Sequence, residues 1–318
     1  MNSHCKKEMA DPSVNFVGLD VSKARLDSFV PGGKPRAWDN TATGHASFIK
    51  HLGILQNPRV VCEASGGHER AVVAALQAAG TGVCVVPPGR VRHYALAEGL
   101  FAKTDRIDAE LLARYGAGIR PPLELPADPA VVRLREMLDF RRILSDRIVA
   151  ATSQFQLAQG YLREGLQSQL DHLKASLRQV NKDIAAHLKS NPVLNAKAKR
   201  LRQLCGVGPV LASTLLAYLP ELGLLGDKTI ASLVGVAPHP ADSGKHRGKR
   251  RIRGGRAVVR EVLYMAAVTA STHNPILAAV YQRLTGKGKL AKVAIVAVMR
   301  KMLSVLNRMI ADPQFSLA

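Results

Sequence analysis

Four acidic side chains in the first third of the chain have types and positions suited to binding a divalent metal ion. Asp20 and Glu63 each end an apolar segment that is predicted to form a buried strand. Asp105 and Asp108 lie three residues apart at a predicted helix start and so share a helix face. Ligand sites in α/β sheets favour the carboxyl ends of strands, so if the two strands are neighbours, all four carboxylates could converge at one sheet edge. Two Mg²⁺ ions held there would assist phosphodiester chemistry.

Each of these acids also has a purely structural interpretation. Asp105 and Asp108 form the pattern of an N-cap residue with its first-turn partner. Glu63 suits a turn before Ser-Gly-Gly, and Asp20 suits the cap of a turn before Lys23. Spacing alone therefore leaves both interpretations open.

A second candidate for chemistry is the dipeptide Ser243-Gly244, which opens the most basic stretch of the chain. Eight basic residues follow before the first acid, Glu261: Lys245, Arg247, Lys249, Arg250, Arg251, Arg253, Arg256 and Arg260. If six of them contact phosphates, the logarithm of the binding constant should fall with that of the salt concentration, at a slope of roughly −5. Cations around the serine could activate it as a nucleophile and hold the scissile phosphate.

The basic stretch has alternatives too. Ser-Gly is common turn chemistry, and a run of basic residues can be a solvated loop. No aromatic residue lies in this stretch, so base stacking is not its expected mode of binding. Lys103, just before Asp105, could orient that carboxylate or a phosphate, or simply lie at a solvated helix entry.

Gly206-Val207-Gly208 lies between a predicted helix end and an apolar helix. This arrangement resembles a helix-hairpin-helix turn, in which Gly206 and Gly208 would let the backbone approach a phosphate. An ordinary turn between two helices fits the same residues.

Composition supports a nucleic-acid partner. Forty-five Lys and Arg against 24 Asp and Glu give a net charge of +21 over 318 residues. Residues 1–130 carry 15 basic and 13 acidic residues, whereas residues 131–318 carry 30 and 11. The four cysteines form no Cys-x-x-Cys pair, and no apolar stretch or leader pattern predicts a membrane span or a signal peptide. We therefore expect a cytoplasmic protein without a membrane partner.

The elements that must position these residues divide the chain into three segments. Residues 14–128 predict a mixed α/β domain in the order β-β-β-α-β-α-β-α, and the Pro-rich segment 121–129 ends it. Residues 129–190 show heptad-like apolar spacing typical of a coiled coil, with Gly160 and Gly165 allowing a bend or hairpin. Residues 191–318 predict a mainly helical domain, with final helices near 256–270 and 289–310.

Taken together, these motifs resemble the DEDD transposases of insertion sequences, relatives of the Piv-type DNA invertases that are described as bridge-RNA-guided recombinases. The resemblance covers about residues 14–311 and rests on order and spacing. Its motifs are Val17-Gly18-Leu19-Asp20-Val21-Ser22-Lys23, Cys62-Glu63-Ala64-Ser65-Gly66, Ala102-Lys103-Thr104-Asp105-Arg106-Ile107-Asp108-Ala109, Gly206-Val207-Gly208-Pro209, Gly235-Val236-Ala237-Pro238, Ser243-Gly244, Tyr264-Met265-Ala266-Ala267 and Met299-Arg300-Lys301.

The resemblance implies a RuvC-like, RNase H-type first domain whose acids Asp20, Glu63, Asp105 and Asp108 bind Mg²⁺, with Mn²⁺ as an alternative. It implies a nucleophilic Ser243 that forms a phosphoserine intermediate with donor or target duplex DNA. It also implies a noncoding bridge RNA as a partner, a homodimer or homotetramer, and a nucleoid-associated place in a bacterial cytoplasm.

Two other functions remain open at this point. A RuvC-like nuclease or junction resolvase would use water as the nucleophile, leaving Ser243 as a turn residue. A decayed transposase would bind nucleic acid without chemistry, although the presence of all four acids and the serine argues against it.

Overall fold

The structure is a computed structural model that describes residues 14–100, 105–240, 248 and 250–316, with the side chains of 105–107 outside the description. The chain divides into two compact units, Met1–Pro126 and Ala127–Ala318. The boundary between them falls inside the Pro-rich segment 121–129.

The first unit is built on a five-stranded mixed sheet in the order β3-β2-β1-β4-β5. β1 pairs antiparallel with β2 and parallel with β4, β2 pairs antiparallel with β3, and β4 pairs parallel with β5. Apolar residues bury β1 and β4 inside the sheet and most of β5 at its edge, as expected of parallel strands covered by helices. The strands are β1 (Asn15–Val21), β2 (Arg25–Phe29), β3 (Arg36–Asp39), β4 (Pro58–Glu63) and β5 (Gly82–Val86).

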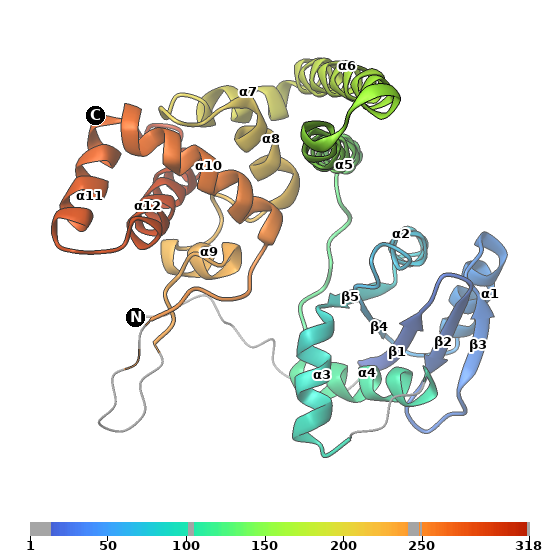
Figure 1. The fold of residues 1–318 in the computed structure, drawn as a ribbon. Coiled ribbons are helices and arrows are strands. Elements are labelled where there is room, and N and C mark those ends of the chain that lie inside the picture. Colours follow the sequence, from blue (N-terminus) through green and yellow to red (C-terminus); the bar gives the residue numbers. More distant parts are fainter. Residues whose placement is uncertain (1–13, 101–104, 241–247, 249, 317–318) are drawn as a thin grey trace. The chain divides into compact units, whose positions relative to one another are not determined.

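Helices cover both faces of this sheet (Figure 1). α1 (Ala42–Leu52) and α2 (Arg70–Ala78) pack on one face, where Leu19 and Cys62 lie in the core. α3 (Pro88–Ala97) and α4 (Asp105–Ile119) pack on the other face, together with Phe16 and Val61. The predicted α/β order is confirmed except for α3, which the sequence reading missed.

The second unit begins with a long helical hairpin, α5 (Pro129–Leu157) and α6 (Gly160–Ser190). The helices run antiparallel, since His187 Nε2 lies 2.8 Å from the Ala130 carbonyl oxygen and Arg141 Nε lies 2.9 Å from Asn181 Oδ1. The chain reverses just before Gly160, whose φ is +51°. The apolar seam is buried between the two helices, whereas coiled-coil geometry stays a prediction.

Shorter helices complete the second unit around one aliphatic core. In the residues that the structure describes, no helix is both long and apolar enough to cross a membrane. Two of these helices, α7 and α11, were not predicted. The helices are α7 (Pro192–Leu201), α8 (Pro209–Tyr218), α9 (Asp227–Val234), α10 (Ala257–His273), α11 (Pro275–Gly286) and α12 (Ala291–Ala311).

Candidate active site

Asp20 and Glu63 lie at matching positions on two neighbouring strands. The parallel register of β1 and β4 pairs Leu19 with Cys62. Asp20 directly follows Leu19, and Glu63 directly follows Cys62, so the two acids occupy equivalent positions on their strands. Side chains alternate along a strand, so Asp20 shares a face with Gly18 and Phe16, and Glu63 shares it with Val61. Both acids are half-buried. The predicted convergence of these two residues at the carboxyl edge is therefore supported by the strand register.

Helix α4 crosses this same face and directs its first turn toward Asp20. A Cβ atom added to Gly18 would lie 1.8 Å from the Ala109 carbonyl oxygen, so β1 and α4 are in direct backbone contact there. Farther along α4, a Cβ added to Gly116 would lie 2.7 Å from Phe16, which is earlier in β1. The helix thus runs antiparallel to β1, and Asp108, half-buried, comes at the Asp20 end. Asp105 begins α4 one turn before Ala109.

The turn that follows Glu63 is held by hydrogen bonds to the carboxylate of Glu69. Glu69 Oε2 accepts hydrogen bonds from the Ser65 backbone N–H at 3.0 Å, the Ser65 hydroxyl at 2.9 Å and the Gly67 N–H at 2.9 Å. Burial opposes the charge on Glu69, but these hydrogen bonds outweigh it and hold the pKa of Glu69 below its usual value. Glu69 thus fixes the turn that follows Glu63, a role the sequence analysis did not identify.

Asp27 is a further acid on this face that the sequence analysis missed. The antiparallel register pairs Asp20 directly with Asp27 on β2, so the two side chains point the same way. Asp27 also forms an ion pair with Arg25, whose Nε lies 3.1 Å from Asp27 Oδ1. The alternation of residues along the strand at 25–29 was the signal that could have located it.

The chemistry of this donor set fits a hard divalent cation, because every candidate ligand is a carboxylate oxygen at one sheet edge. Within the described residues, which exclude the Asp105 side chain, no three His, Cys, Asp or Glu side chains lie close enough together to hold a metal ion. The strand register and the path of α4 thus bring Asp20, Glu63 and Asp108 to the carboxyl edge of the sheet, but these side chains do not lie close enough together to form a metal-binding cluster. Which of them would bind metal stays a prediction.

The serine and much of the basic stretch lie outside the described residues, namely Lys103, Ser243, Lys245, Arg247 and Lys249. The described flanks of the serine segment are held together by an antiparallel bridge between His239 and Arg251. The His239 N–H lies 3.0 Å from the Arg251 carbonyl oxygen. Arg250, Arg251 and Arg253 are exposed, as expected of residues available to a phosphate.

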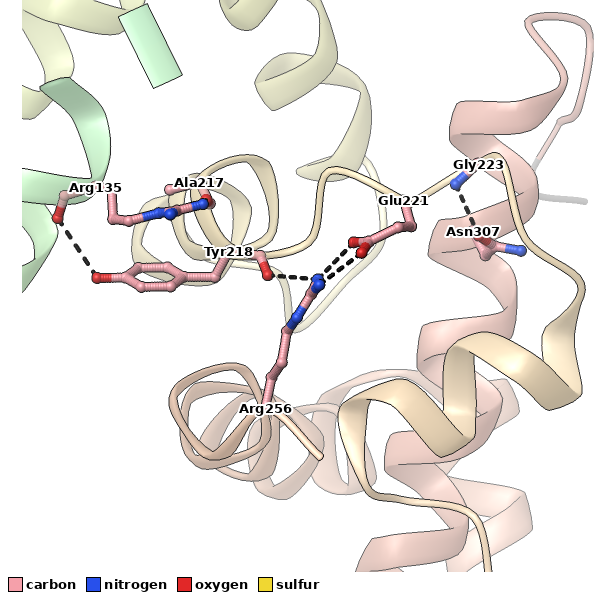
Figure 2. Close-up of polar contacts among 7 residues, drawn as sticks. All are labelled: Arg135, Ala217, Tyr218, Glu221, Gly223, Arg256 and Asn307. Atoms are coloured by element: carbon pink, nitrogen blue, oxygen red, sulfur yellow. Dashed lines mark hydrogen bonds and ion pairs between the residues drawn. The ribbon is translucent and has the colours of Figure 1, made fainter. Parts of the chain in front are cut away.

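Arg256, also predicted to contact nucleic acid, is engaged within the protein (Figure 2). Its guanidinium contacts both carboxylate oxygens of Glu221, with Nη2 at 2.6 Å from Oε1, and donates to the Tyr218 carbonyl oxygen at 2.9 Å. The Tyr218 hydroxyl donates in turn to Asp139 Oδ1 at 2.6 Å, on α5. Arg135 of the same helix donates to the Ala217 carbonyl oxygen at 2.8 Å. Arg256 thus anchors the end of the basic stretch, a role that the charge pattern did not indicate.

The two glycines of the proposed hairpin turn differ in their surroundings. Gly206 has φ +100°, and a Cβ added there would lie 2.7 Å from Ala270 Cβ on α10. Gly208 precedes α8, and a Cβ there would meet nothing within 4 Å. Gly206 therefore has a packing reason to be glycine, whereas phosphate contact at either position stays a prediction.

Carboxylates at the ends of adjacent parallel strands, followed by a strongly basic helical unit, are the combination expected of a metal-assisted enzyme of nucleic-acid processing. Comparisons with known protein families agree. A DEDD transposase model of the IS110 type matches residues 17–158, and a model described as the transposase IS116/IS110/IS902 family matches residues 198–282. The chain belongs to this family of DEDD transposases, enzymes that cleave and rejoin DNA. Membership implies an RNase H-like first unit, with which the mixed sheet agrees.

Individual relatives extend the match over nearly the whole chain. The pilin gene-inverting proteins of Moraxella lacunata and Moraxella bovis are each 27% identical over 92% of this chain and 94% of their own length. A 44.8 kDa uncharacterized protein of insertion element IS116 from Streptomyces clavuligerus is 28% identical over 56% of this chain and 45% of its own.

Proposed function

We propose that the protein is an insertion-sequence recombinase that cuts and rejoins DNA through a phosphoserine intermediate. Asp20, Glu63, Asp105 and Asp108 would hold the divalent metal, and Ser243 would be the nucleophile. The observation that carries the proposal is the pairing of Asp20 and Glu63 on adjacent strands beneath the start of α4. The similarity to two proteins named for pilin gene inversion supports rejoining in addition to cutting.

In the proposed reaction the Ser243 oxygen attacks the phosphorus of a phosphodiester and loses its proton. A phosphorus–serine ester forms while the bond from phosphorus to one sugar oxygen breaks, and that sugar oxygen takes up a proton. The number of phosphoester bonds is unchanged, so a hydroxyl of another strand can reverse the step without an external energy source. Simple hydrolysis would not conserve the bond in this way.

The metal would be Mg²⁺, as one or two ions, with Mn²⁺ as an alternative. Bound at the four acids, it would lower the cost of the negative charge that develops on the transferred phosphate. Asp20 and Glu63 would hold their positions through the sheet, and Glu69 would fix the turn after Glu63.

Duplex DNA, as donor and target, would bind the basic second unit. We assign the phosphate contacts to Lys103, Lys245, Arg247, Lys249, Arg250, Arg251 and Arg253, with the backbone of Gly206 and Gly208 as a further contact. A noncoding bridge RNA would select the sites, and the working unit would be a homodimer or homotetramer in the bacterial cytoplasm. The exposure of Arg250, Arg251 and Arg253 supports this assignment.

A covalent trapping assay tests the proposal. The full chain is incubated with Mg²⁺, RNA from the region flanking the element and DNA that spans its junction, and is then denatured and searched for protein–DNA adducts. We expect an adduct that maps to Ser243 and is absent in both Ser243→Ala and Asp20→Ala. Cleaved DNA without an adduct would overturn the phosphoserine mechanism in favour of hydrolysis by a RuvC-like nuclease.

A further inference from the structure

The second unit contains an apolar groove that the proposed chemistry does not use. Its volume is about 1240 Å³, and it lies among α10, α11, α12 and the segments 236–238 and 250–252. Its apolar lining, called the floor below, consists mainly of aliphatic side chains and one aromatic ring, including Val280, Leu284, Val293, Val296 and Tyr264. Val293 is 53% exposed, so this apolar surface faces solvent in the isolated chain. An exposed apolar surface of this size is typical of a binding site.

Basic residues line the groove together with the apolar ones. Exposed basic residues from three separate segments line the groove, namely Arg250, Arg251, Arg283, Lys292, Arg300 and Lys301. Two acids, Asp227 and Glu261, also line the groove, and the basic residues outnumber them. The groove therefore suits an anionic ligand that also has apolar parts to bury.

Described residues that flank the serine-containing segment 241–249 take part in the groove. Arg251 lines the groove and also forms the bridge with His239 that joins the two described flanks of residues 241–249. Arg250 and Ile252, on either side of Arg251, line it as well. A nucleic-acid strand that contacts Arg250 and Arg251 would thus lie beside this groove.

We infer that the groove binds an unpaired segment of the DNA strand beside the reacting phosphodiester, with its bases on the apolar floor and its phosphates at the basic rim. This inference rests on the proposed function. A duplex presents its phosphates to a protein and keeps its base faces stacked, so it would leave the floor in water. Unpaired bases offer apolar faces, and proteins that bind them use apolar and aromatic surfaces together with a positive groove. Strand exchange needs unpaired bases next to the cut.

The test measures the binding of the bases separately from that of the phosphates. The full chain, kept free of divalent ions so that no cleavage occurs, is titrated into a fluorescent 12-nucleotide oligo-dT. A second probe has the same phosphates but abasic sites at its six central positions. We expect the intact strand to bind at least about tenfold more tightly than the abasic strand.

A pair of matched variants locates this preference. Val293→Asp places a carboxylate in the groove at an exposed position, so that folding is not at risk, and should abolish the preference for the intact strand. Val268→Asp makes the same change on α10, outside the groove, at a side chain that is 36% exposed, and should leave the preference unchanged. A strand carrying 4-thiothymidine should cross-link to the peptide that contains Tyr264.

Several outcomes would overturn the inference. Equal affinities for the intact and abasic strands, or a preference that survives Val293→Asp, would show that bases do not enter the groove. Equal base-dependent binding of oligo-dU and oligo-U would overturn the assignment to DNA. Displacement of the bound strand by an acidic amphipathic helical peptide that itself loses affinity in Val293→Asp, without any base preference, would identify a protein-binding groove. Base-dependent binding in a protein that forms no Ser243 adduct would uphold the groove and overturn the phosphoserine mechanism.

Discussion

The guanidinium of Arg256 contacts both carboxylate oxygens of Glu221 and so fixes the end of the basic stretch to the segment after α8. Arg256 also donates to the Tyr218 carbonyl oxygen, and Tyr218 contacts α5 through Asp139. One basic side chain from a stretch expected to face DNA therefore links three segments of the second unit. The bidentate geometry makes it an internal anchor.

Arg256→Ala and Glu221→Ala should each destabilise the protein, and the double variant should cost less than the sum of the two. The side chains are only about two-thirds buried, at 33% and 32% exposed, so we expect a coupling energy of about 1–2 kcal/mol. Denaturant unfolding of the four proteins measures it. Strictly additive effects would show that the ion pair contributes nothing in solution.

The same pair should make stability depend on pH in the acid range. Burial opposes ionisation of Glu221, but the hydrogen bond from Arg256 outweighs it and holds the pKa of Glu221 below its usual value. On acidification the unfolded chain therefore binds the proton first. The stabilisation is complete above the ordinary glutamate pKa of about 4.3 and is lost as pH falls below it. Thermal unfolding of wild type and Arg256→Ala should show their Tm difference shrinking from pH 6 to pH 3; a constant difference would contradict this account.

The backbone contact between β1 and α4 predicts a large effect from a small substitution. Gly18→Ala would place its Cβ 1.8 Å from the Ala109 carbonyl oxygen, and no rotamer change can relieve a clash with backbone. We expect a loss of about 3 kcal/mol in unfolding free energy and a displaced α4, because overpacking a tight core is costly. Gly89→Ala, in the open first turn of α3, is the control and should be neutral or slightly stabilising. A Gly18→Ala protein as stable as wild type would refute the contact.

Much of the fold could be predicted from the sequence because strands buried on both sides appear as short apolar runs. The order of the five strands along the chain agrees with the predicted β-β-β-α-β-α-β-α order. Three helices were missed, and each begins at a proline: α3 at Pro88, α7 at Pro192 and α11 at Pro275. Proline stops a strand or the interior of a helix, but it suits the first helical position, where no N–H is needed. At α11, Asn274 caps the helix by accepting from the Ile276 and Leu277 N–H groups, so an Asn-Pro signal was present.

The positions of the candidate site residues could be predicted from the sequence, but the residues that they contact in the fold could not. Asp20 and Glu63 could be located because each ends an apolar run, and the register places them side by side. The engagement of Arg256 by Glu221 could not be found, since the two residues are 35 positions apart and no local pattern links them. Pairing across the fold decides which basic residues stay available to a phosphate, and composition does not contain that information.

Asp20 and Asp27 offer a matched test of which acid on this face is required for chemistry. They are paired across β1 and β2 and point the same way, but Asp27 lies on the strand farther from Glu63 and forms an ion pair with Arg25. Asp20→Asn should reduce metal-dependent cleavage by about a thousandfold or more, because it removes a ligand charge. Asp27→Asn should retain activity within about tenfold. Cleavage is measured on labelled junction DNA over a range of Mg²⁺ concentrations. Equal losses in the two variants would place Asp27 in the metal site.

The salt dependence of DNA binding should distinguish an exposed basic side chain, Arg253, from one that is engaged within the protein, Arg256. Arg253 is exposed, whereas the Arg256 guanidinium is held by Glu221. Each phosphate contact that is removed should reduce the slope of log K against log salt by about 0.9. Arg253→Ala should therefore reduce the slope by about that amount, and Arg256→Ala, which removes the same formal charge three residues away, should leave it unchanged. Fluorescence anisotropy with a fixed duplex at several NaCl concentrations measures both. An equal reduction in the two variants would mean that Arg256 leaves Glu221 to bind phosphate, which would turn the internal anchor into a part of the DNA interface.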